Sequence, residues 1–126
     1  MIYFISVDKP FTIEDVQITP ITVMHGKLPI YAYRIGDFIY ATDCSNIPEA
    51  SWDYFKNAEV LVLDCLRYRP HPTHFNVDQA VEAAKKIGAK QTFFTHISHE
   101  LDHDAVNATL PENITLAYDG LIIESN

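Results

Sequence analysis

Cysteine, basic residues and long apolar runs are all scarce in this sequence of 126 residues. The two cysteines, Cys44 and Cys65, follow apolar segments, which indicates reduced, buried thiols rather than a disulfide framework. Lys and Arg total nine, and the formal net charge of -8 argues against a nucleic-acid-binding surface. No apolar run approaches the ~20 residues that cross a bilayer, and the first residues lack the regions of a signal peptide. These absences predict a cytoplasmic protein with no membrane partner.

The remaining composition is that of an ordinary globular protein. Apolar residues make up 48% of the chain and charged residues 21%. A chain of this length can bury a core of its own, and it contains no repeats or linker-like stretches. We therefore predict one domain, residues 1–126.

The apolar pattern predicts antiparallel strands first and alternating strands and helices later. Strands are expected at residues 2–7, 16–24, 31–35, 38–42, 60–63, 92–95, 114–117 and 121–123, with a brief pairing at 11–13. Helices are expected at about 48–56 with Ser45 or Asn46 as cap, from Asn76 or Asp78 to about Ile87 before Gly88, and through Leu110. This order predicts an α/β (α+β) fold with a mixed sheet covered by helices.

Residues that could bind a metal follow four of the predicted strands. They are His25, Asp43, Asp64 and His96. If neighbouring strands point the same way, His25, Asp43 and His96 meet at one edge of the sheet, where such folds build ligand sites. Two imidazoles and a carboxylate suit Zn²⁺, Mn²⁺ or Fe²⁺. Taken singly, each has a simpler explanation: a surface histidine, a helix cap at Asp43, or a hydrogen-bonding carboxylate at Asp64.

Histidine is concentrated in two later segments, residues 71–74 and 96–103, which hold five of the six histidines. The second segment could be a solvated polar loop or a metal cluster of its own. Its His99-Glu100-x-x-His103 satisfies the letters of a zincin motif, but that motif requires a helix. A strand predicted at 92–95 leads directly into this segment, so the zincin interpretation is weak.

Five short stretches resemble, in order, the second half of the metallo-β-lactamase fold, and most closely its PhnP-like phosphodiesterase branch. They are residues 23–26, 33–43, 69–74, 95–99 and 116–121. The resemblance runs from about residue 16 to the C-terminus. It implies half of an αββα sandwich, with a mixed β-sheet and helices on one face.

The resemblance also implies roles for individual residues. His25 would bind one metal, Asp43 would bridge two metals, and His96 would bind the second. His74 resembles the histidine that faces the scissile phosphate and assists leaving-group protonation or charge development. The implied reaction is hydrolysis of a small phosphodiester at a two-metal site. Residues that would lie beside the ligands or at the edge of the substrate are His71, His99, Asp102, His103 and Asp64.

One part of the family pattern is missing. The His-x-His-x-Asp-His motif, which supplies most ligands, should precede His25, yet residues 1–24 contain no histidine. We therefore expect one divalent metal ion or none, where the family site holds two, and an isolated chain without activity. Half a sandwich would expose an apolar sheet face, so we also expect a homo-oligomer or a complex with the missing N-terminal half.

Two other interpretations stay open. The chain could be a non-catalytic partner or a relic half-domain that binds metal weakly or not at all. It could also be a mononuclear enzyme in which His25, Asp43 and His96 hold one metal with a water molecule.

Overall fold

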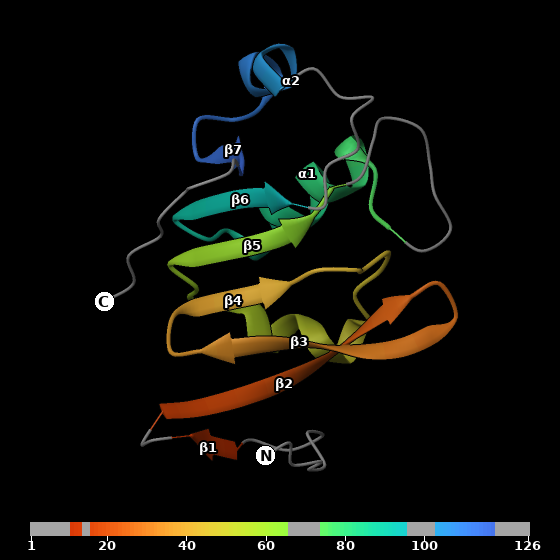
Figure 1. Ribbon diagram of the computed structural model, residues 1–126, viewed down its shortest axis with the longest axis vertical. Helices are drawn as coiled ribbons and strands as arrows, with labels where there is room; N and C mark the ends of the chain where they lie inside the picture. Colours follow the sequence, from red (N-terminus) through yellow and green to blue (C-terminus); the bar gives the residue numbers. More distant parts are fainter. Residues whose placement is uncertain (1–10, 14–15, 66–73, 96–102, 118–126) are drawn as a thin grey trace, which may run out of the picture.

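The computed structural model describes residues 11–13, 16–65, 74–95 and 103–117. These residues form a seven-stranded sheet in the order β1-β2-β3-β4-β5-β6-β7, accompanied by helices (Figure 1). The strands are β1 (Phe11–Ile13), β2 (Val16–His25), β3 (Leu28–Ile35), β4 (Phe38–Ala41), β5 (Val60–Asp64), β6 (Gln91–Thr95) and β7 (Ile114–Leu116). The helices are the 3₁₀ helix η1 (Glu49–Phe55) and the α-helices α1 (Val77–Ile87) and α2 (His103–Thr109).

The sheet is mixed, as the sequence predicts. Strands β1 to β4 are antiparallel to their neighbours, whereas β4 to β7 are parallel. Because β2 and β4 are both antiparallel to β3, they run in the same direction as each other and as β5 and β6. The carboxyl ends of these four strands therefore lie at one edge of the sheet (Figure 1).

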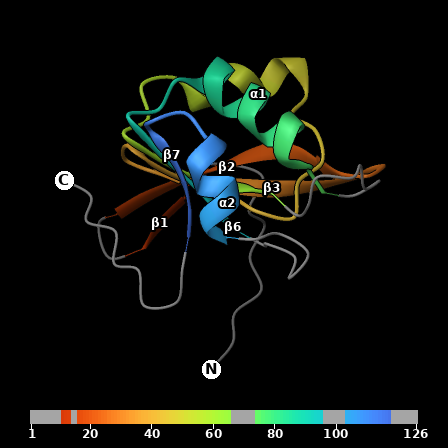
Figure 2. The ribbon, with the colours of Figure 1, turned by 90° about the horizontal axis from the view of Figure 1, so that it is seen from above.

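The helices η1 and α1 lie on one face of the sheet (Figure 2). Alternate strand residues point into the core beneath them, and among these Ile39, Leu61, Leu63 and Phe94 are fully buried. Phe55 of η1 belongs to the same core cluster. This arrangement confirms a mixed sheet with helices on one face.

The opposite face is rich in aromatic and aliphatic side chains. Tyr40 lies between the buried Ile39 and Ala41, so it points away from the helices, and it is 47% exposed. Tyr33 pairs with Tyr40 across β3 and β4, so it shares this face. Helices η1 and α1 both lie on the other face of the sheet (Figure 2).

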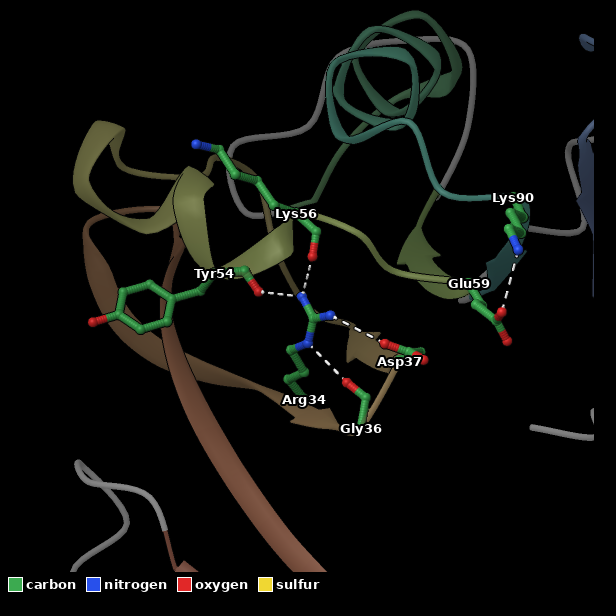
Figure 3. Close-up of polar contacts among 7 residues, drawn as sticks. All are labelled: Arg34, Gly36, Asp37, Tyr54, Lys56, Glu59 and Lys90. Atoms are coloured by element: carbon green, nitrogen blue, oxygen red, sulfur yellow. Dashed lines mark hydrogen bonds and ion pairs between the residues drawn. The ribbon is translucent and has the colours of Figure 1, made fainter. Parts of the chain in front are cut away.

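The turn between β3 and β4 is fixed by Gly36 and Arg34. Gly36 is the first central residue of this two-residue turn and has a φ of 57°, as a type II′ turn requires at that position. The Arg34 guanidinium donates to the carbonyls of Gly36, Tyr54 and Lys56 (Figure 3). These bonds fasten the end of η1 to the start of the hairpin turn.

Two predicted helices compare differently with the structure. The expected helix at 48–56 is the 3₁₀ helix η1, and its N-cap, Pro48, makes no side-chain cap bond, so the prediction that Ser45 or Asn46 caps it is wrong. Helix α1 begins as predicted, with Asn76 and Gln79 forming a capping box, and it ends at Gly88 with a φ of 70°. The strands predicted at 2–7 and 121–123 lie outside the described residues.

Within the described part of the chain, the helices are too short or too polar to cross a membrane.

Candidate metal centre

Three of the predicted site residues come together at the edge formed by the carboxyl ends of β2 and β4. His25 is the last residue of β2, and Asp43 follows β4 after Thr42. His74 precedes the cap of α1, and its segment is held against the Asp43 segment because the Phe75 amide donates to the Cys44 carbonyl at 2.9 Å. The sequence predicts that His25 and Asp43 meet if their strands run in the same direction, and β2 and β4 do so.

His25 and Asp43 are joined by a hydrogen bond that involves the main chain. The Nδ1 atom of His25 lies 2.7 Å from the Asp43 carbonyl oxygen. A carbonyl oxygen only accepts, so Nδ1 carries the hydrogen, and in the neutral imidazole Nε2 then keeps the lone pair. An imidazole that is oriented through one nitrogen is ready to bind a metal through the other.

The ring of His74 lies beside that of His25. Their centroids are 5.2 Å apart and the rings are T-shaped, at 77° to each other. Burial lowers the pKa of His74 below its ordinary value of 6.5, the charge of His25 lowers it further, and the Asp43 carboxylate acts in the opposite direction. The net effect favours a neutral His74 imidazole.

Asp43 has an unusual backbone conformation, with a φ of 59°. Aspartate is one of the few residues other than glycine that adopts this left-handed region with little cost. The following residues are tied to the end of β2, since the Met24 amide donates to the Asn46 carbonyl and the Ser45 amide donates to the Met24 carbonyl, at 2.9 and 2.7 Å. This backbone pairing keeps Asp43 next to His25.

The other predicted site residues are not placed. His71, His96, His99 and Asp102 lie outside the described residues. Asp64 ends β5 and His103 begins α2, but the structure describes only the backbone of these two. The role of His96 as a metal ligand and the contacts of the other five with ligands or substrate stay predictions.

The described donors fit part of a metal site. His25 Nε2 and the Asp43 carboxylate are chemically suited to Zn²⁺, Mn²⁺ or Fe²⁺. Among the residues with described side chains, no three His, Cys, Asp or Glu residues gather into a metal-binding group. Because catalytic zinc sites use three protein ligands, a complete site needs donors besides these two.

Residues 2–97 match a family described as “Beta-lactamase superfamily domain”. The chain belongs to this superfamily, whose hydrolases usually bind divalent metals, and its sheet has the metallo-β-lactamase fold.

Two solved structures share this fold with the chain. A “new diphosphatase from the PhnP family” is 44% identical, with a TM-score of 0.92 over 94% of this chain. The metallo-β-lactamase fold protein YhfI from Bacillus subtilis is 26% identical, with a TM-score of 0.75 over 93% of this chain. The chain spans 47% of the first protein and 53% of the second, or about half of each.

A curated relative extends the comparison. An octanoyltransferase of Porphyromonas gingivalis is 35% identical over 116 residues, which are 90% of this chain but 24% of that protein. Most of that protein lies outside the match, so its named activity does not bear on the residues of this site.

Proposed function

We propose that this chain carries the C-terminal part of the active site of a metal-dependent phosphodiesterase. The observation that carries the proposal is the pairing of His25 with Asp43 at the edge of the sheet, which leaves Nε2 of His25 available. The 44% identity to a PhnP-family diphosphatase supports a phosphorus substrate rather than a lactam. Substrates of this kind include small phosphodiesters and diphosphates.

The chain would hold divalent metal ions through three residues. His25 would bind through Nε2, Asp43 through its carboxylate, and His96, which lies outside the described residues, through its imidazole. Zn²⁺, Mn²⁺ and Fe²⁺ all accept these donors. Bound metal would supply an activated water and neutralise charge on the phosphate oxygens.

His74 is the catalytic residue of this proposal. Its lowered pKa favours the neutral imidazole, which keeps one N–H group that can donate a hydrogen bond. Beside His25, His74 is suited to donate to the phosphate oxygen on which charge builds during attack. Water forms a bond to phosphorus and gives up one proton, the bond to the leaving oxygen breaks, and the leaving oxygen gains one proton. A diester then gives a monoester and an alcohol.

The remaining ligands would come from outside this chain. Residues 1–24 hold no histidine, and the PhnP-family diphosphatase is about twice as long as the region that matches. We propose that an N-terminal half of the same fold, or a second copy of this chain, packs on the sheet face opposite η1 and α1. The apolar character of that face supports such a partner.

The test begins with metal bound per chain after purification without chelator or added metal. The chain is then mixed with the N-terminal half of the PhnP-family diphosphatase and assayed with bis(p-nitrophenyl) phosphate and a dinucleoside diphosphate. We expect the mixture to hydrolyse at least one of these compounds. Asp43→Ala should reduce that rate at least 100-fold, because the carboxylate expected to bridge the metals is lost.

A matched control is Asp53→Ala, which removes an exposed carboxylate on η1 that pairs with Lys56. This variant should keep the full rate. A mixture that forms a complex and binds metal but hydrolyses neither compound would favour the alternative, a non-catalytic partner or relic half-domain. The absence of a three-donor metal group among the described side chains is the observation that favours this alternative.

A further inference from the structure

We propose that Ser45 is the positioning residue of the metal centre, which holds His25 with Nε2 directed away from the protein backbone. The inference rests on the proposed role of His25 and Asp43 as ligands. Ser45 is not itself a candidate ligand, and its sequence position suggests only a helix cap, although the N-cap position of η1 is occupied by Pro48.

Ser45 makes hydrogen bonds to the two residues that flank His25 in the sequence, Met24 and Gly26. Its hydroxyl accepts from the Gly26 amide at 2.9 Å and lies 3.2 Å from the Met24 carbonyl, to which it donates. Its own amide donates to the same Met24 carbonyl at 2.7 Å. One side chain therefore contacts the residue before His25 and the residue after it.

We call these bonds of Ser45 to Met24 and Gly26 the Ser45 clamp. The clamp also fixes Asp43, which lies only two residues before Ser45. With Ser45 bound to Met24 and Gly26, the Asp43 carbonyl is held 2.7 Å from Nδ1 of His25. That carbonyl requires hydrogen on Nδ1, whereas an unconstrained imidazole favours hydrogen on Nε2. The clamp thus selects the tautomer that leaves Nε2 as a donor for metal.

A second serine provides a matched control. The hydroxyl of the buried Ser51 donates to the Thr22 carbonyl at 2.6 Å, so it also binds the β2 backbone, but three residues before His25. If hydroxyl bonds to β2 act only by stabilising the strand, Ser45→Ala and Ser51→Ala should have similar effects. If Ser45 positions the ligand, only its loss should change the state of His25.

The first readout is the tautomer of His25 in the metal-free full chain, from ¹⁵N NMR of the imidazole at a pH where the ring is neutral. We expect hydrogen on Nδ1 in the wild type and in Ser51→Ala, and a shift towards hydrogen on Nε2 in Ser45→Ala. Ser45→Thr keeps a hydroxyl and should restore the wild-type signal. Unfolding curves of all variants show whether each is folded.

The second readout is Zn²⁺ affinity, by competition with a fluorescent chelator. Loss of a group that orients a ligand commonly weakens metal binding 10- to 100-fold, so we expect a loss of this size in Ser45→Ala and recovery in Ser45→Thr. An unchanged His25 tautomer in Ser45→Ala would overturn the inference. A wild-type chain that binds no Zn²⁺ would instead contradict the proposed function, and the tautomer comparison would still decide the role of Ser45.

Discussion

His25 and Asp43 meet through an imidazole and a main-chain carbonyl, at a distance of 2.7 Å. At the scale of residues, the sequence identifies both as candidate ligands because each follows a predicted strand. The sequence does not reveal the carbonyl contact, which depends on the left-handed backbone of Asp43. It also does not reveal Ser45, because a serine between a strand and a helical segment resembles an ordinary cap.

The titration of His74 tests the electrostatics of the site. In the metal-free chain, we expect NMR to give His74 a pKa below 6.5, because burial and the charge of His25 disfavour its protonation. His25→Ala should raise this pKa and Asp43→Asn should lower it further. A shift of the same sign in both variants would contradict this account.

The same titration affects stability. Because the folded-state pKa of His74 is lowered, the unfolded chain binds the proton more readily. The contribution of His74 to stability is therefore fully present above pH 6.5 and is lost as the pH falls through its folded-state pKa. Urea unfolding at several pH values should show that the free energy of unfolding depends less on pH in His74→Gln than in the wild type.

At the scale of elements, the sequence predicts most strands and the capped helix α1, because their apolar periodicity and caps are local features. It also predicts a helix at about 48–56 but not that this helix, η1, is a 3₁₀ helix. The end of η1 is bound to Arg34, 20 and 22 residues before the carbonyls it contacts. No local pattern specifies such a contact.

The contacts of Arg34 predict that losing its side chain lowers the free energy of unfolding more than losing that of Lys90 (Figure 3). Arg34 is 19% exposed and donates to three carbonyls, so Arg34→Met should reduce the free energy of unfolding by about 2 kcal/mol. Lys90 is 79% exposed and pairs with Glu59 at 3.3 Å, so Lys90→Met should cost less than about 1 kcal/mol. Urea unfolding, followed by the fluorescence of the single tryptophan, Trp52, measures both. Equal losses in the two variants would contradict the role given to Arg34.

At the scale of the whole molecule, η1 and α1 both lie on one face of the sheet and leave the other face to different parts of the structure (Figure 2). A sheet face rich in tyrosine and aliphatic residues favours association in water. The chain also spans about half of each solved relative reported above. Both observations support the proposal that a partner packs on the sheet face opposite η1 and α1.

Two tyrosines of similar exposure test whether this face associates. Tyr40, on the face opposite the helices, is 47% exposed, and Tyr54, on η1, is 54% exposed. We expect the isolated chain to self-associate in sedimentation velocity, Tyr40→Lys to shift it towards the monomer, and Tyr54→Lys to leave it unchanged. A wild-type chain that sediments as a monomer at all concentrations would contradict self-association.

The order of strands and helices, the turn at Gly36 and the residue types available for a metal can all be read from the amino-acid sequence. These features depend on near neighbours along the chain, where apolar spacing and backbone preferences act directly. Three features arise only in the folded chain: the carboxyl ends of β2 and β4 lie at one edge, Ser45 binds both neighbours of His25, and η1 and α1 share one face of the sheet. These features join residues about 20 positions apart or depend on strand direction, and only the folded backbone fixes such contacts.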